Sequence, residues 1–284
     1  MLTRRTTQRL YLLRPSAKVN ACIRYCVAIA QRRSGIKIHS LVFMSNHYHM
    51  VVTDEEGTLP IFTEELNKNL AKSLNCLHSR WENLWSGGDK TNYLTLADEE
   101  TVLEKTVYAL SNPTKAGLTS HGGDWPGVRL FRKGEYLAKK PGFFFRPKAK
   151  GGKLPDKLHL KLTAPPIGVH EKIAEDIVQS ATTKEEKLLR NDWLKSGKKF
   201  LGASGVKAQP IHASPKTPAT HKKMCPRVAC KDKLLRSKML RSLKAFEEAY
   251  KPLQKRFAGG DHSVEFPLGT YRMPRFYGAR CAEE

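Results

Sequence analysis

Two adjacent apolar runs, residues 36–44 and 47–53, constrain the fold more than any other feature of the sequence. Both are rich in Ile, Val, Leu and Phe, which suit strands. Only Ser45 and Asn46 separate the runs, a spacing typical of a tight connection between antiparallel strands. The sequence therefore predicts a β-hairpin in the front half of the chain.

Helix-like periodicity flanks this hairpin. Residues 18–33 and 62–81 repeat apolar side chains at helical spacing, and Gly35 provides a stop after the first segment. Cys22 and Cys26, four residues apart, suit one buried helical face. Residues 97–110 form a third predicted helix, which Asp98 caps and which ends at Asn112.

Two further strands complete the predicted sheet. Residues 8–13 read as a short first strand, and residues 84–96 as a weaker fourth strand. The order is then strand, helix, strand, strand, helix, strand, helix. It predicts an α+β fold, a ferredoxin-like split βαβ antiparallel sheet with helices on one face.

Positive charge is concentrated in the back half. The chain has 50 Lys and Arg against 27 Asp and Glu, but residues 1–130 contribute only 16 and 12 of these. We therefore predict a globular domain over residues 1–130 and a basic, partly linker-like extension over residues 131–284 that contacts a polyanion such as DNA. A solvated, disordered tail is the alternative. The C-terminal segment FPLGTYRMPRFYGAR interleaves aromatic and basic residues, which favours either base stacking or a terminal strand packed on a core.

No apolar run is long enough for a membrane span, and the N-terminal apolar stretch is too short for a signal peptide. We therefore expect a cytoplasmic protein without a membrane partner.

His47 and His49 are the first candidates for chemistry. Successive strand residues point to opposite faces, so these two imidazoles project together while Tyr48 points away. Two neighbouring imidazoles are half of a metal site, but two structural histidines would give the same pattern.

Tyr108 and Asn112, near the end of the third predicted helix, are the second candidates. Four residues apart, they share one helical face. Tyr108 is a possible nucleophile and Asn112 a neutral oxygen ligand. The same residues would also suit a core aromatic and a helix stop.

Together, FMSNHYHMVV and YALSNPTKAGL resemble the two motifs of the REP-associated tyrosine transposases, a branch of the single-tyrosine HUH endonucleases. The matching residues are Asn46, His47, His49, Tyr108, Asn112, Pro113, Ala116 and Gly117. Ser45 departs from the usual proline, and Thr114-Lys115 from a common valine-arginine. The resemblance covers roughly residues 6–130.

The resemblance implies a metal-dependent endonuclease and strand transferase that acts on single-stranded or hairpin DNA as a homodimer. It implies that His47, His49 and Asn112 hold Mg²⁺ or Mn²⁺, and that Tyr108 forms a 5′-phosphotyrosine intermediate. Lys115 is a possible helper of Tyr108, or simply a solvated lysine.

Two other functions fit the same residues. One is a catalytically inactive DNA- or RNA-binding protein derived from a transposase. The other is a zinc-dependent hydrolase that uses the histidine pair, for which Asp54, Glu55 and Glu56 are the only nearby carboxylates.

Overall fold

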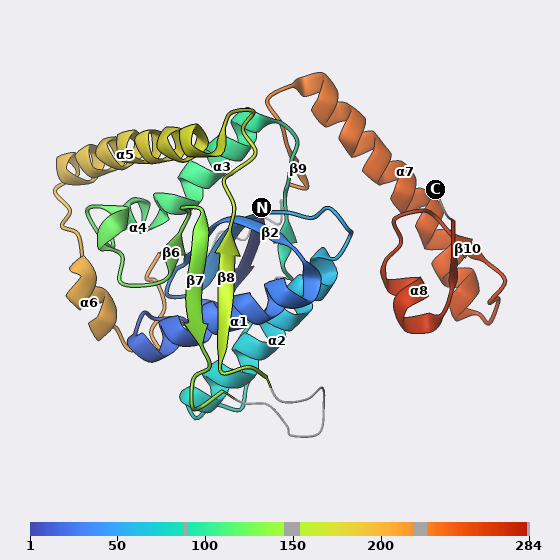
Figure 1. Ribbon diagram of the computed structural model, residues 1–284, viewed down its shortest axis with the longest axis horizontal. Helices are drawn as coiled ribbons and strands as arrows, with labels where there is room; N and C mark the ends of the chain where they lie inside the picture. Colours follow the sequence, from blue (N-terminus) through green and yellow to red (C-terminus); the bar gives the residue numbers. More distant parts are fainter. Residues whose placement is uncertain (88–89, 145–153, 218–225, 283–284) are drawn as a thin grey trace.

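The computed structural model describes residues 1–87, 90–144, 154–217 and 226–282. A mixed sheet lies at its centre, with the strand order β4-β1-β3-β2-β8-β7 and with β6 also paired to β2 (Figure 1). These strands are β1 (Leu2–Arg5), β2 (Lys37–Phe43), β3 (His47–Thr53), β4 (Asn92–Tyr93), β6 (Arg129–Leu130), β7 (Gly134–Lys139) and β8 (Lys157–Leu162). Neighbouring strands are antiparallel except for β2 and β8. The chain is α+β, as predicted.

The predicted hairpin is confirmed as β2 and β3. Phe43 pairs with Tyr48 in the register, and the amide of Met44 donates to the carbonyl of His47 at 2.8 Å. Ser45 and Asn46 form the connection. The hairpin therefore places His47 at the very start of β3.

The predicted first strand over residues 8–13 is wrong. The edge of the hairpin is paired by β1, and the chain then turns through a short 3-10 helix, Thr7–Arg9, in which Gln8 and Arg9 have φ of 48° and 60°. Leu12 and Leu13 follow as consecutive buried residues. A one-sided strand would bury only alternate residues, so the apolar pattern here belongs to a packed turn.

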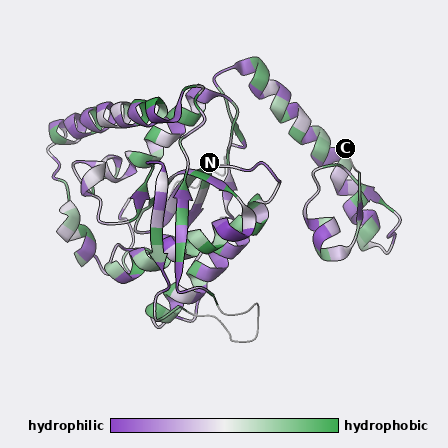
Figure 2. Ribbon diagram, in the orientation of Figure 1, coloured by the Kyte–Doolittle hydropathy of each residue, from purple (hydrophilic) through white to green (hydrophobic). Residues whose placement is uncertain are grey.

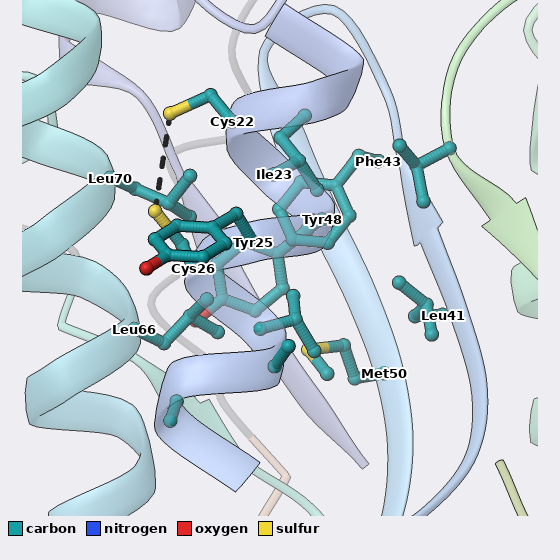
Figure 3. Packing of buried hydrophobic residues seen from close by; sticks show 14 of the residues in the cluster. Cys22, Ile23, Tyr25, Cys26, Leu41, Phe43, Tyr48, Met50, Leu66 and Leu70 are labelled. Carbon is teal, nitrogen blue, oxygen red and sulfur yellow. Dashed lines mark hydrogen bonds between the residues drawn. The ribbon is translucent and has the colours of Figure 1, made fainter. Parts of the chain in front are cut away.

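Helices α1 (Ala17–Ser34) and α2 (Leu59–Leu77) cover one face of the sheet, as predicted. The Ser16 side chain caps α1 by accepting from the amide of Val19, and Gly35 ends it with φ of 71°. Figure 3 shows Cys22 and Cys26 inside this layer, with their sulfur atoms 3.9 Å apart, as expected for two thiols on one buried face.

The same core contains the largest buried side chains of the sheet. Figure 3 shows Leu41, Phe43, Tyr48 and Met50 packed against α1 and α2. Because Tyr48 is fully buried on this face, its neighbours His47 and His49 point to the other.

The prediction that helices lie on one face only is wrong. Val42 clusters with Ala109 and Leu110 of α3 (Glu99–Leu110), whereas Leu41 and Phe43 belong to the core beneath α1 and α2. Every residue of β2 after Lys37 is buried. A strand that is apolar on both faces needs cover on both. Helices α4 (Asn112–Lys115) and α5 (Glu171–Lys195) pack beside α3 on this second face, and α6 (Gly202–Ala208) follows (Figure 1).

The sheet continues beyond residue 130. Strands β7 and β8 lie in the predicted extension, yet they form a hairpin that joins the sheet where Ile38 of β2 pairs with Leu162. Helix α5 also lies beyond residue 130 and runs to Lys195. The short strand β5 (Thr95–Leu96) pairs instead with β9 (Val228–Ala229), so the predicted fourth strand consists of two short strands.

Residues 226–282, here named the C-terminal module, lie to one side of the sheet (Figure 1). They comprise β9, α7 (Lys233–Ala258), β10 (Glu265–Phe266), α8 (Arg272–Tyr277) and β11 (Arg280–Cys281). Hydrophilic and hydrophobic residues are interspersed along the whole of α7 (Figure 2), and none of its residues is buried. Within the described ranges, no helix combines the length and apolarity needed to cross a bilayer.

Candidate active site

His47 and His49 lie side by side on the face of β3 that α3 covers. Their ring centroids are 4.9 Å apart, and the rings are nearly perpendicular. His49 is buried, and His47, at the strand's first position, is partly buried. The alternation of β3 thus brings two imidazoles to one point.

The end of α3 brings Tyr108 and Asn112 to the same place. The His49 and Tyr108 ring centroids are 5.5 Å apart, and Asn112 Nδ2 lies 3.2 Å from His49 Nε2. Asn112 is buried, whereas Tyr108 keeps 37% of its surface exposed. All four residues singled out in the sequence therefore meet, and the tyrosine among them is open to a large substrate.

A break between two helices positions this pair. Helix α3 ends at Leu110, and Pro113 cannot supply the amide that would continue it, so α4 starts afresh at Asn112. The Ser111 hydroxyl donates to the Val107 carbonyl at 2.8 Å and closes the last turn. Asn112 is thereby turned towards β3.

Asn46 fixes the ring of His47. The Asn46 side-chain nitrogen donates to the carbonyl of Arg9 at 3.1 Å, so its oxygen faces His47 Nδ1 at 2.7 Å. Since that oxygen can only accept, Nδ1 carries the hydrogen and Nε2 presents a lone pair. A histidine oriented through Nδ1 by a neighbouring oxygen is the usual arrangement of a metal ligand.

Thr3 contacts the corresponding ring nitrogen of His49. Its hydroxyl lies 2.9 Å from His49 Nδ1, because Thr3 pairs with His49 in the β1–β3 register. Directly opposite residues of an antiparallel pair share a face, so β1 contributes side chains to the site. Neither Thr3 nor the role of Asn46 was identified from the sequence. Thr3 was missed because the first strand was placed at residues 8–13.

Burial keeps both imidazoles neutral. Burial, together with the nearby guanidinium groups of Arg5 and Arg9, lowers the pKa of His47 to about 4. Burial, and to a smaller extent the neighbouring His47, holds the pKa of His49 well below its usual value. Neutral imidazoles have the lone pairs that metal binding requires.

Cationic side chains surround the site. Arg5 is the register partner of His47 and shares its face of the sheet. On the other side, the exposed ammonium of Lys115 lies 4.6 Å from the centre of the Tyr108 ring. The sequence left Lys115 as either a helper or a solvated residue. The structure gives it a contact with Tyr108 while its charge remains in water.

Gly117 and α5 close the back of the site. Gly117 has φ of 68°, and a Cβ there would lie 2.1 Å from a ring carbon of Trp193 in α5. Only glycine fits both the left-handed turn and the close approach of the indole. The packing of α5 thereby fixes the end of α4, next to Asn112.

The donors suit a divalent ion with few protein ligands. Two imidazole nitrogens face the site, and rotation of the Asn112 amide by 180° would present its oxygen instead of its nitrogen. In the part of the chain that the structure describes, no three His, Cys, Asp or Glu side chains cluster as a possible metal site. A centre here would therefore consist of His47, His49 and the amide, with positions open for substrate oxygens.

Comparisons with protein-family models, curated proteins and solved structures give no significant match.

Proposed function

We propose that the protein is a metal-dependent endonuclease and strand transferase that cuts single-stranded or hairpin DNA through a 5′-phosphotyrosine on Tyr108. The observation that carries this proposal is the meeting of four residues from two distant segments. His47 and His49 on β3 face Asn112 and Tyr108 at the end of α3, and only the tyrosine among the last two is exposed.

The fold supports the proposal. Strands β1 to β4 have the order β4-β1-β3-β2, every neighbouring pair is antiparallel, and α1 and α2 share one face. We infer from this order that these elements form a ferredoxin-like split βαβ arrangement.

His47, His49 and Asn112 would hold Mg²⁺ or Mn²⁺, which when bound polarises a phosphate oxygen and offsets its charge. The chain's own residues supply the rest. Asn46 keeps the Nε2 lone pair of His47 directed into the site, and the Thr3 hydroxyl contacts Nδ1 of His49. Arg5 offers positive charge beside His47, where a DNA phosphate can bind.

Tyr108 is the nucleophile. Its phenolic oxygen loses a proton to solvent and forms a bond to phosphorus, and the bond from phosphorus to the 3′ oxygen of the preceding nucleotide breaks. That oxygen takes up a proton and leaves as a 3′-hydroxyl. The ammonium of Lys115 over the ring places a positive charge beside the nucleophile, where it can contact the DNA phosphate. The reverse attack by a 3′-hydroxyl rejoins the strand without a nucleotide cofactor.

End-labelled hairpin DNAs incubated with the protein and Mn²⁺, then resolved on denaturing gels, test the proposal. Wild type should give a nicked strand and a protease-sensitive adduct. Tyr108→Phe and His47→Ala should give neither, whereas Tyr136→Phe, a tyrosine of β7, should match wild type. Binding without nick or adduct, across varied hairpins and metals, would instead support the non-cutting nucleic-acid-binding protein.

The resemblance suggests a second copy of the chain as a partner, and the positive charge suggests a further contact with DNA. We propose that the protein acts as a homodimer, and that cations beyond residue 130 add affinity for the DNA backbone that does not depend on sequence. Sedimentation measured with and without hairpin DNA would test the dimer: a monomer under both conditions would exclude it.

A further inference from the structure

The C-terminal module presents an unusual surface at α8. Phe276 and Tyr277 keep 56% and 53% of their surface exposed, although Phe266 and Met273 nearby are buried in the module's own small core. The terminal segment therefore uses part of its apolar content to fold and leaves two adjacent aromatic rings in water. Large exposed rings contribute little to folding and are typical of binding surfaces.

Arginine side chains lie over one of these rings and over the neighbouring ring of Tyr271. The guanidinium of Arg272 lies 6.0 Å from the centre of the Tyr277 ring, and that of Arg275 lies 5.5 Å from the centre of the Tyr271 ring. Stacked guanidinium groups remain charged and hold a fixed plane. The surface of α8 thus alternates flat apolar faces with positive charge.

Part of this surface lines an open groove against α2. Arg272, Phe276 and Tyr277 form one wall, Glu64 of α2 forms the other, and the volume is about 410 Å³. Glu64 also lines a second groove of about 380 Å³ further along α2, where the guanidinium of Arg4 lies 5.4 Å from the centre of the Trp85 ring. The two grooves share Glu64 as a lining residue, and an arginine lies near an aromatic ring in each, although Trp85 itself is buried.

The charge of the module indicates the occupant. Residues 226–282 contain 13 Lys and Arg against five Asp and Glu. A polyanion with unpaired bases matches both the positive charge and the exposed rings, because bases stack on aromatic side chains and phosphates contact arginine. Paired bases in a duplex do not offer these faces. The carboxylate of Glu64, which lies 3.9 Å from the Lys68 ammonium, can accept from base amino groups.

We propose that the groove between α8 and α2 binds single-stranded nucleic acid, with bases stacked on Phe276 and Tyr277 and phosphates held by Arg272 and Arg275. This site is separate from the proposed chemistry, because α2 covers the face of the sheet opposite to His47 and His49. It would hold a strand at a distance from the nucleophile.

Fluorescence anisotropy of a labelled dT20 oligonucleotide tests the proposal on the full chain, in the Tyr108→Phe background so that cutting plays no part. Phe276→Ala combined with Tyr277→Ala should weaken binding by roughly 10- to 100-fold. A labelled duplex of the same length should be affected less than threefold. Trp81→Ala removes a ring that is 99% exposed at the end of α2 and should leave dT20 binding unchanged.

Tyr277 also touches the ring of Phe257, so a second pair of variants separates stacking from folding. The Tyr277→Phe variant should bind dT20 as tightly as its parent does. The Tyr277→Leu variant, which keeps an apolar side chain but has no aromatic face, should bind several-fold more weakly. Equal binding by the Phe and Leu variants, or binding by the double alanine variant within twofold of its parent, would overturn the proposal. A cleavage failure with intact dT20 binding would count against the chemistry alone.

Discussion

The sheet with its helices and the C-terminal module differ in how much of their surface is buried. In the first, Tyr25, Phe43, Tyr48 and Phe62 are all fully buried in one continuous core. In the second, the 26-residue helix α7 buries no residue, and the core consists of four side chains. Dense packing holds side chains to one conformation, whereas a thinly packed element opens at low cost in free energy.

The two proposed activities follow this difference. Chemistry at Tyr108 depends on rings and amides held within a fraction of an ångström, and its residues all come from the dense part. Stacking and phosphate contacts at α8 tolerate movement, because every base has a flat face and every phosphate a charge. The densely packed sheet region and the thinly packed C-terminal module should therefore respond differently to substitution.

The largest expected effect separates the two regions by stability. Phe62→Ala should lower the free energy of unfolding of the sheet region by about 3–5 kcal/mol, as large core truncations do. Phe266→Ala should instead release only the C-terminal module, since Phe266 packs in that module's own cluster. Hydrogen exchange measured by mass spectrometry would show this directly. Uniformly faster exchange throughout the chain in Phe266→Ala would mean that the two regions unfold as one.

The next effect concerns pH. The pKa of His47 is lowered to about 4 in the folded chain, against about 6.5 when unfolded, so between these values the unfolded chain binds more protons. Stability without metal should therefore be constant above pH 6.5 and fall towards pH 4. The loss from His47 should be at most about 3 kcal/mol, because the side chain is partly exposed. His49 acts in the same direction.

Denaturant titrations of the metal-free protein across this range would measure the loss. His47→Gln should make the dependence on pH shallower, whereas His262→Gln, in the C-terminal module, should leave it as it is. An identical slope in the His47→Gln variant would show that His47 does not titrate in the way its burial implies.

Asn46→Ala should reduce Mn²⁺ affinity and nicking by about 10- to 100-fold, because His47 loses the oxygen that fixes its ring. Asn75→Ala is the matched control, since that amide, near the end of α2, donates to the Glu82 carbonyl in the segment that follows the helix. Calorimetric titration with Mn²⁺ gives the affinity. Unchanged Mn²⁺ affinity in Asn46→Ala would show that Asn46 does not orient His47 for metal binding.

Thr3→Val should have the smallest effect, a loss of Mn²⁺ affinity of up to about tenfold, because it removes the hydroxyl beside His49 while keeping the side chain's shape. Thr3→Ser should restore most of that affinity. If Thr3→Val and Thr3→Ser bind Mn²⁺ equally, the hydroxyl does not orient His49.

The sequence predicted the parts of the molecule that depend on local pattern. Helical periodicity and capping located α1, α2 and α3, and strand alternation put His47 and His49 on one face. Prediction from the sequence failed where contacts between segments distant in the chain determine the structure. The pairing of β1 with His47 and His49 lies beyond any local signal, and so do the joining of β8 to β2 and the second helical layer.

The same reason explains what was missed at the site. Asn46 belongs to the motif that carries the resemblance. Its contact with His47 depends on a second hydrogen bond to the Arg9 carbonyl, and the strand wrongly predicted over residues 8–13 gave no indication of that bond. Lys115 stands seven residues after Tyr108 in the sequence, and its contact with the ring depends on how α4 continues from α3.

The proposed mechanism requires that Tyr108 becomes covalently linked to DNA. Wild-type protein, incubated with Mn²⁺ and a hairpin oligonucleotide, would be digested with trypsin and nuclease and its peptides sequenced by mass spectrometry. We predict a 5′-phosphonucleotide on the tyrosine of the peptide TVYALSNPTK, residues 106–115, and none in the Tyr108→Phe protein. A nucleotide attached to a different residue, or nicked DNA without any modified peptide, would contradict the claim.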